Sequence, residues 1–584
     1  MRVLLTSLNS KFIHSNLALR YLKVSCKSLP VTIVMDEFTI NDHIESILGS
    51  IYKHSPDIVA FSCYIWNIRE TLMIVESLKK VLPNCIIILG GPEVSFDSVR
   101  LMERNPDIDI IVMGEGEITF PLLIERIIMD KPLDNLDGIT FRHNDRIVEN
   151  RDRELIKDLD IIPFPYEDGF EGLENRIIYY ETTRGCPFQC QYCLSSTSQG
   201  VRYFSLDRVK RDIKNFIDAG VPQVKLVDRT FNCNPKRARE IFKMIMDMGG
   251  NTNFHFEMCG DLLDEETLDV LKDAPPGLFQ FEIGVQSTRE KTLDIIKRKT
   301  DFEKLAKWVS KLQEFRNIHL HLDLIAGLPE EDYLSFQRSF NDVYQLKPDR
   351  LQLGFLKLLK GSGIRNNASR WDYKFISYPP YEVLENKDIS FGEILKLKGV
   401  EELVEKYYNT HRFENSLNYL ANIFNKDYYK LYDRFAEYWD EKGYNKISHS
   451  QIRLYEILLE FGLGLEGVDH VLFKDLIKLD YVSQQKPARY PKGIEVELSQ
   501  EEKKAIRNFF NDSENISKYL PHLAKYTPSQ ISRMAHIELF DYDVTQNLDT
   551  GQIRKRPTAV LFDYNIPNKL FNKSKITRLD SLFK

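Results

Sequence analysis

Three of the eight cysteines of this 584-residue chain lie in one short segment, TTRGCPFQCQYCLSS, residues 182–196. Cys186, Cys190 and Cys193 have the spacing C-x3-C-x2-C. Thiolates are soft ligands that select zinc, Cu(I) or iron–sulfur clusters. A structural zinc site needs four closed ligands, and the segment offers neither a fourth cysteine nor a nearby histidine. Three thiolates on a [4Fe–4S] cluster leave one iron open, so we interpret the segment as a cluster loop with room for a further ligand.

The composition is ordinary for a globular protein. Hydrophobic residues make up 43% and charged residues 28% of the chain, and the formal net charge is −7. No stretch reaches the roughly 18 apolar residues of a membrane span, and polar residues interrupt the start, MRVLLTSLNSKFIHSN, too early for a signal peptide. We therefore predict a cytoplasmic protein with neither membrane nor nucleic-acid partner. Thiols stay reduced in the cytoplasm, which favours a metal site over disulfides.

About the first 130 residues alternate short apolar runs with amphipathic helical stretches. The runs are continuous rather than alternating and rich in Val, Ile and Leu, which is typical of strands buried on both faces. They read RVLLTS, VTIVMD, DIVAFSC, CIIILGG and IDIIVMG. Five such strand–helix units predict a doubly wound parallel sheet of flavodoxin or Rossmann-like type, which binds ligands at the carboxyl ends of its strands.

We bound this first region at residues 1–135, and three segments follow it. Residues 136–175 contain a hairpin pattern, GITFRHNDRIVENR, and a proline-punctuated connector, which we interpret as a linker. From 176 to 360 a second series of six βα units predicts a partial (β/α)6 barrel with its chemistry at the carboxyl ends of the strands. The cysteine loop directly follows the first of these strands. Residues 375–584 predict a mainly helical domain with a short pair of strands.

The cysteine spacing at this place in a six-unit βα series resembles the radical S-adenosylmethionine (SAM) superfamily, over residues of roughly 176–356. The resemblance implies a [4Fe–4S] cluster on the three cysteines, with SAM bound to the open iron. It also implies that the reduced cluster cleaves SAM to a 5′-deoxyadenosyl radical, with electrons from a donor such as flavodoxin or ferredoxin. The alternatives are a zinc knuckle with a remote fourth ligand and a chance clustering of cysteines.

Further residues at strand ends match positions that contact SAM in the superfamily. Tyr192 matches the aromatic residue that packs on the adenine. Asp228 and Asn232, in VDRTFN, lie where the superfamily holds the methionine amine, although this chain lacks the Gly-Gly-Glu of many members. The other predicted contacts are Glu257, Glu282, Gln286, Ser287, Asp323 and Gly327. Each of these alone could be a hydrogen-bonded strand end, but as a set at successive strand ends they favour a ligand site.

The loops of the first region resemble those of the radical SAM subgroup that has an N-terminal cobalamin-binding domain. The matching segments are FSCYIWN, LGGPEVSF and MGEGE. The residues that this resemblance places along the cobalamin tail are Ser62, Gly90, Gly91, Gly114 and Gly116. Glycine permits close approach of a ligand to the backbone, but paired glycines also make tight βα turns. The chain lacks D-x-H-x-x-G, and we expect His14 to be a loop residue rather than a cobalt ligand.

The resemblance implies a cobalamin-dependent radical SAM enzyme, and we expect a methyltransferase that acts on an unactivated carbon or phosphorus centre. In that reaction methylcobalamin donates the methyl group to a substrate that the sequence does not name. A first alternative is another radical modification, such as a rearrangement, with cobalamin bound or vestigial. A second alternative is a non-catalytic sensor of cobalamin or iron.

Overall fold

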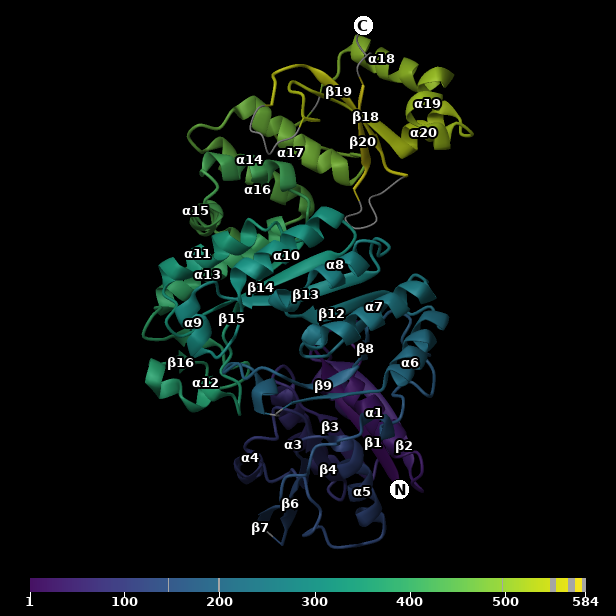
Figure 1. Ribbon diagram of the computed structural model, residues 1–584, viewed down its shortest axis with the longest axis vertical. Coiled ribbons are helices and arrows are strands. Elements are labelled where there is room, and N and C mark those ends of the chain that lie inside the picture. The colour runs from purple at the N-terminus through teal and green to yellow at the C-terminus, as the bar shows by residue number, and fades with distance from the viewer. Residues whose placement is uncertain (145, 198–199, 496, 547–552, 566–572, 580–584) are drawn as a thin grey trace.

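The computed structural model describes residues 1–144, 146–197, 200–495, 497–546, 553–565 and 573–579. Three regions follow one another along the long axis (Figure 1), with the first sheet at one end, a βα barrel in the middle and a helical region with a small sheet at the other end. This arrangement confirms the predicted mixed α/β fold class. No helix in the described part of the chain combines the length and the apolar character that crossing a membrane requires.

The first sheet has seven strands in the order β2-β1-β3-β4-β5-β6-β7. Its strands are β1 (Arg2–Asn9), β2 (Thr32–Thr39), β3 (Ile58–Ser62), β4 (Ile86–Gly90), β5 (Ile110–Val112), β6 (Ile139–His143) and β7 (Arg146–Glu149). Strands β1 to β5 run parallel in the flavodoxin-like order 2-1-3-4-5. The hairpin β6–β7 adds antiparallel to the β5 edge, so the segment that the sequence suggested as a linker extends this sheet.

Five helices cover the two faces of the first sheet. They are α1 (Leu17–Ser25), α2 (Ile44–His54), α3 (Ile68–Val81), α4 (Ser98–Arg104) and α5 (Gly116–Ile128). One hydrophobic cluster joins α2, α3 and α4 to one face, and a second cluster joins α1 and α5 to the other. Burial on both faces is the reason that the strands are continuously apolar.

The middle region is built on an open sheet of six parallel strands in the order β15-β14-β13-β12-β11-β8. These strands are β8 (Ile178–Tyr180), β11 (Gln223–Leu226), β12 (Asn253–Met258), β13 (Phe279–Gln286), β14 (His319–Ala326) and β15 (Arg350–Phe355). The helices on its outer face are α6 (Leu206–Asp218), α7 (Pro235–Met248), α8 (Glu265–Leu271), α9 (Glu290–Ile295), α10 (Phe302–Phe315) and α11 (Tyr333–Tyr344). A hairpin of β9 (Thr183–Cys186) and β10 (Gly200–Tyr203) follows β8.

Successive side chains of the barrel strands point to opposite faces of the sheet, and β13 shows this most regularly. In β13, Phe279, Phe281, Ile283 and Val285 are buried against the helices, whereas the residues between them are only half-buried. The half-buried set faces the other side of the sheet, which we call the lumen. The charged and ionisable side chains on the lumen face of β11 to β14, whether half-buried or, as for the two buried histidines, more enclosed, are Lys225, His255, Glu257, Glu282, His319, His321 and Asp323. The interior of a βα barrel is usually filled by apolar side chains. Charged side chains in the lumen therefore indicate a ligand-binding or catalytic site.

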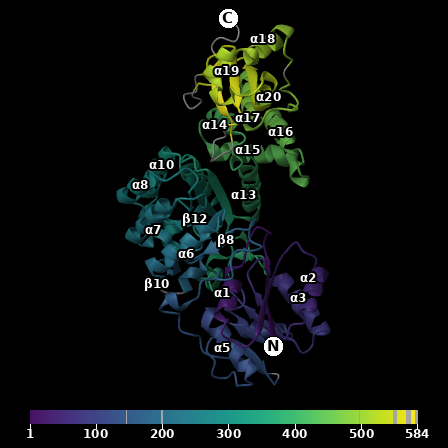
Figure 2. The same cartoon turned by 90° about the vertical axis from the view of Figure 1, so that its right-hand side faces the viewer.

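The chain leaves the barrel through α12 (Gly363–Asn366), β16 (Lys374–Phe375) and β17 (Val383–Glu385). The helices that follow are α13 (Phe391–Leu403), η6 (Val404–Tyr408), α14 (Glu414–Ile423), α15 (Tyr428–Glu441), α16 (Gln451–Leu463), α17 (His470–Gln484), α18 (Gln500–Asn511), α19 (Ser513–Tyr519) and α20 (Pro528–Met534). An antiparallel sheet ends the described chain, with strands β18 (Ala535–Phe540), β19 (Thr558–Asp563) and β20 (Lys575–Leu579). In both views this sheet lies at the opposite end of the molecule from the first domain (Figures 1 and 2).

Candidate functional site

The cysteine loop begins at the end of β9. Cys186 is the last residue of that strand, and Gly185 before it has φ +93°. A Cβ at Gly185 would lie 2.2 Å from the carbonyl oxygen of Gly200 on the paired strand, so the hairpin requires glycine there. Cys190 is 7% exposed, while Cys186 and Cys193 are half-buried. Two of the three cysteines are thus partly exposed.

Segments distant in sequence hold the cysteine loop on both sides. The amide of Gln191 donates to the carbonyl oxygen of Ile296 over 2.8 Å, and the amide of Ile364 donates to the carbonyl oxygen of Gln191 over 2.9 Å. The buried guanidinium of Arg298 donates to the Tyr192 hydroxyl over 3.1 Å and to the carbonyl oxygen of Gly284. Tyr192 is thereby packed into the barrel wall next to the cysteines.

The electrostatic setting of Cys190 depends on the same arginine. Burial raises the pKa of the Cys190 thiol, and the nearby Arg298 cation partly offsets this. Removal of Arg298 would leave the buried thiolate without its main compensating charge. The sequence interpretation did not single out Arg298, because it lies more than 100 residues from the cysteines with no motif of its own.

Several predicted SAM contacts already have all their hydrogen bonds within the protein. Asp228 is fully buried, and its carboxylate accepts from the Thr182 amide and from the hydroxyls of Thr182 and Thr183, the last two over 2.6 Å. The Asn232 side chain exchanges two hydrogen bonds of 2.8 Å with the backbone of Cys259. Asp228 thus positions the start of the strand that leads to the cysteines, whereas Asn232 holds the backbone after β12.

Ser287 and Gly327 are occupied in the same way. The Ser287 hydroxyl donates to Glu331 over 2.5 Å and accepts from the Arg289 amide. The carbonyl oxygen of Gly327 accepts from the Tyr373 hydroxyl over 2.8 Å and from the Asn386 side chain over 3.1 Å. Their assignment as SAM contacts stays a prediction.

Three other residues predicted to contact SAM have side-chain polar atoms without a hydrogen bond to a described residue. Glu257 makes no hydrogen bond or ion pair with any residue that the structure describes, and burial raises its pKa to about 7. Gln286 has φ +72°, a strained conformation for a residue other than glycine, and its buried Oε1 has no partner among the described residues. Asp323 also has a buried oxygen without a hydrogen bond. The structure brings these three side chains to one side of the sheet, where a ligand could pair with them.

Glu282 belongs to an ion-pair group that the sequence interpretation missed. Its carboxylate lies 3.0 Å from Lys225 Nζ and 2.9 Å from His255 Nε2. Burial alone would raise the pKa of Glu282, but the bonds from His255 and Lys225 hold it well below its usual range. The period-2 alternation of β11 and β12 was the signal that could have placed Lys225 and His255 in the lumen.

The predicted cobalamin-tail residues follow β3, β4 and β5 at the carboxyl edge of the first sheet. Gly91 has φ +114°, and a Cβ there would lie 2.5 Å from the carbonyl oxygen of Cys63. Its glycine is therefore required by the fold itself. Gly114 has φ +72° and open space around the Cβ position, which leaves a ligand room. Ser62 is buried, with its carbonyl oxygen bound by Asn67, and Gly90 ends β4. The assignment of these residues to cobalamin stays a prediction.

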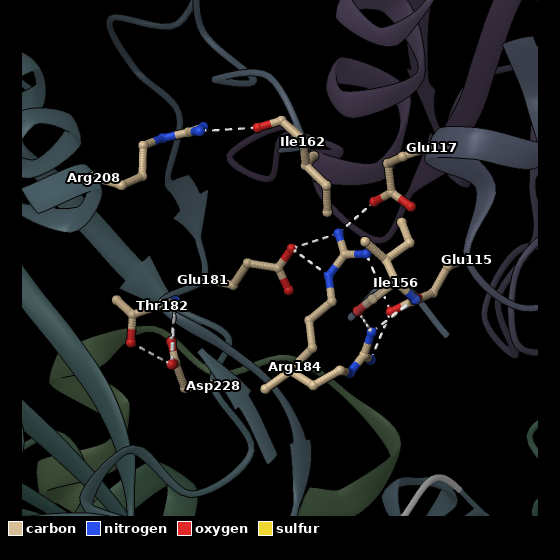
Figure 3. A network of polar contacts seen from close by, with 10 residues as sticks. Glu115, Glu117, Ile156, Ile162, Glu181, Thr182, Arg184, Arg208 and Asp228 are labelled. Atoms are coloured by element: carbon tan, nitrogen blue, oxygen red, sulfur yellow. Dashed lines mark hydrogen bonds and ion pairs between the residues drawn. The ribbon is translucent and has the colours of Figure 1, made fainter. Parts of the chain in front are cut away.

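A dense ion-pair group ties this edge to the cysteine strand, and we call it the junction. It consists of Glu115, Glu117, Glu181, Arg184 and Arg202 (Figure 3). Arg184, two residues before Cys186, lies between Glu181, at 2.7 Å, and Glu117. Glu115 accepts from Arg202 over 2.7 Å and from Arg184 over 3.3 Å. The junction side chains named in these ion pairs are 10–18% exposed.

The junction carboxylates respond differently to burial. Burial would raise the pKa of Glu115, but Arg202 and the Ile156 amide, which donates over 2.8 Å, bring it below its ordinary value. Glu181 is more deeply buried, and that burial raises its pKa despite Arg184. The sequence interpretation noted the glycines of MGEGE but not that the glutamates between them would bind the cysteine strand.

Two further contacts join the first sheet to the barrel. The carboxylate of Glu93, in GGPEVS, lies 3.1 Å from Lys360 Nζ and also accepts from the Tyr381 hydroxyl. His14 Nδ1 lies 2.6 Å from the Tyr179 hydroxyl of β8, and burial lowers the pKa of His14. Loops after β1, β4 and β5 therefore all contact the barrel region. His14 lies in the loop after β1 and makes one of these contacts.

Comparison with known families divides the chain into three matched segments. Residues 3–124 match the B12 binding domain, and residues 180–343 match the Radical SAM superfamily. Residues 369–562 match a family described as a protein of unknown function, DUF4080. The first two segments coincide with the doubly wound sheet and the six-stranded barrel.

Individual proteins match the chain at low identity. An uncharacterized methyltransferase of Pyrococcus horikoshii is 24% identical over 64% of this chain and 81% of its own length. The cobalamin-dependent radical SAM methyltransferase TokK of Streptomyces tokunonensis is 28% identical over 50% of this chain, which is 45% of TokK. A structure of the cobalamin-dependent S-adenosylmethionine radical enzyme OxsB with aqua-cobalamin bound superposes with a TM-score of 0.60, 15% identity, 85% of this chain and 82% of that chain.

The domain order, the cysteine loop and the fold agree with one another. The cofactors of these two domains are a [4Fe–4S] cluster, SAM and cobalamin. The chain therefore carries a B12-binding domain followed by a radical SAM domain, and it is an enzyme.

Proposed function

We propose that this enzyme is a cobalamin-dependent methyltransferase. The observation that carries the proposal is the docking of the carboxyl edge of the first sheet, through the loops after β1, β4 and β5, against β8, the segment after β15 and the strand β9 that ends at Cys186. Parallel sheets bind their ligands at this edge, so the two cofactor sites would open toward one shared space. The methyltransferase names among the relatives point in the same direction.

The residues of the chain would divide the work as follows. Cys186, Cys190 and Cys193 would hold the cluster, and Arg298 would balance the charge of the buried Cys190 thiolate. The free oxygens of Gln286 and Glu257 would orient bound groups at the lumen face. When bound, the cluster supplies the electron that cleaves SAM, and cobalamin carries the methyl group.

Product stoichiometry tests the proposal. The anaerobic holoenzyme is incubated with SAM, dithionite and fractionated small-molecule extracts, and the products are quantified by mass spectrometry. Methyl transfer predicts S-adenosylhomocysteine and 5′-deoxyadenosine in equal amounts, two SAM consumed for each methylated product. Formation of 5′-deoxyadenosine alone with a converted substrate would indicate another radical modification. Absence of both products in every fraction would support a sensor.

A further inference from the structure

A second group of ligating side chains lies in the lumen, apart from the cysteines. A carboxylate oxygen of Glu282, Nε2 of His321 and a carboxylate oxygen of Asp323 all lie within 4.8 Å of one another. His321 and Asp323 alternate on β14, so they share a face, and Glu282 is the register partner of His321 on β13. Backbone pairing of two neighbouring strands therefore fixes the three positions.

Two of these ligand atoms lack a hydrogen bond. His321 Nε2 and Asp323 Oδ1 are 3.0 Å apart, but their geometry is not that of a hydrogen bond, and neither has another partner among the described residues. His321 is 6% exposed. Buried polar atoms are normally satisfied. Two ligands on one ion, with bonds of about 2.1 Å at right angles, are about 3.0 Å apart, which matches this pair.

The third proposed ligand, Glu282, is fixed by hydrogen bonds to the oxygen that would not bind the metal. Oε2 of Glu282 accepts hydrogen bonds from Lys225 and His255, which leaves its Oε1 available. Carboxylates that bind metals are commonly fixed by such outer hydrogen bonds. The orientation of Glu282 is thus set before any ion arrives.

We propose that Glu282, His321 and Asp323 bind a divalent transition-metal ion in the barrel lumen, in addition to the cluster on the cysteines. Two oxygens and one imidazole nitrogen suit Mn2+, Fe2+ or Zn2+ rather than a soft ion. Three protein ligands leave coordination positions open for water or for an oxygen or nitrogen atom of a substrate. The proposal does not depend on the methyl-transfer reaction, because it concerns binding alone.

Manganese tests the site without interference from iron. The anaerobic holoenzyme, with its cluster in the diamagnetic oxidised state, is titrated with Mn2+ alone, and free Mn2+ is measured by electron paramagnetic resonance. We expect one bound Mn2+ per chain, displaced by Zn2+. In Asp323→Asn and in His321→Gln, affinity should fall at least about tenfold, since each replaces a carboxylate or imidazole ligand by a neutral amide that binds these ions weakly.

The matched control is Glu257→Gln, which removes a lumen carboxylate that is not a ligand. Its Mn2+ affinity should change by no more than about threefold if coordination rather than local charge holds the ion. Iron and sulfide content confirm that each variant keeps its cluster. Absence of stoichiometric binding of Mn2+, Zn2+ and Fe2+ would overturn the proposal. Equal affinity of the wild-type protein and both ligand variants, or an equal loss in Glu257→Gln, would also overturn it.

Discussion

The junction and the lumen both bury carboxylates, but they compensate them differently. At the junction, Glu115, Glu117 and Glu181 surround two arginines, and each carboxylate has at least one guanidinium partner. In the lumen, Glu282 is paired with Lys225 and His255, but Glu257 makes no hydrogen bond or ion pair with a described residue. A group with all its hydrogen bonds made contributes to holding the structure, whereas a group left open carries a desolvation cost that a ligand can relieve. The comparison indicates that the junction holds the domains together and the lumen receives ligands.

The largest expected effect is that of a substitution in the cysteine loop, which lies outside both the junction and the lumen. Cys190→Ala should lose the cluster and all reductive SAM cleavage, while junction and lumen stay folded, because the loop is at the carboxyl end of the barrel. Iron content, the absorbance of the cluster and 5′-deoxyadenosine formation measure this. Cys85→Ala is the control, as that cysteine lies in the first domain, away from the loop. Retained cleavage in Cys190→Ala would contradict the assignment of the cluster ligands.

The next largest effect concerns the centre of the junction. Arg184→Ala leaves Glu117 and Glu181 buried without their guanidinium, which should lower the free energy of unfolding by about 3 kcal/mol. Denaturant titration measures the change. Lys214→Ala removes an exposed partner of Asp218 and should have almost no effect. A loss in Arg184→Ala no larger than in this control would mean that the junction does not hold the domains.

Glu257→Gln should act in the opposite direction and stabilise the protein. The folded-state pKa of Glu257 is about 7, above its unfolded value, so ionisation destabilises the folded state increasingly as the pH rises from about 4.5 to 7. The variant should gain on the order of 2 kcal/mol at pH 8 and nothing near pH 4. Thermal unfolding of metal-free protein across this range measures the difference. A pH-independent difference would show that Glu257 already has a charge partner.

Glu115→Gln tests the same chemical change at the junction and should be the smallest effect. The folded-state pKa of Glu115 is lowered, so its carboxylate contributes stability that is present above the unfolded value and is lost as the pH falls through the folded one. The variant should lose about 1 kcal/mol at pH 7, and the difference should vanish in acid. If Glu115→Gln stabilised the protein at pH 7, as Glu257→Gln is expected to do, the proposed difference between the junction and the lumen would be wrong.

The sequence predicts the two βα series and the cysteine loop well, because apolar runs and short-range spacing are local patterns. It does not predict which polar side chains are already bonded. Asp228 takes its hydrogen bonds from Thr182 and Thr183, more than 40 residues earlier, so its saturation is a property of the folded barrel. Glu257 has the same residue class and a similar strand-end position, yet it is open. Asp228 and Glu257 differ in their hydrogen bonds to residues that are distant in the sequence, and no single segment of the sequence contains that information.

The two backbone hydrogen bonds of Gln191, to Ile296 and from Ile364, have a consequence for the order in which the cysteine loop is completed during synthesis. During synthesis, the three thiols leave the ribosome about 170 residues before Ile364, whose amide binds the Gln191 carbonyl oxygen. A nascent chain that ends before Ile364 exposes its cysteines without the second support of their loop. The cysteine loop therefore reaches its final backbone support only when the chain has been translated through Ile364.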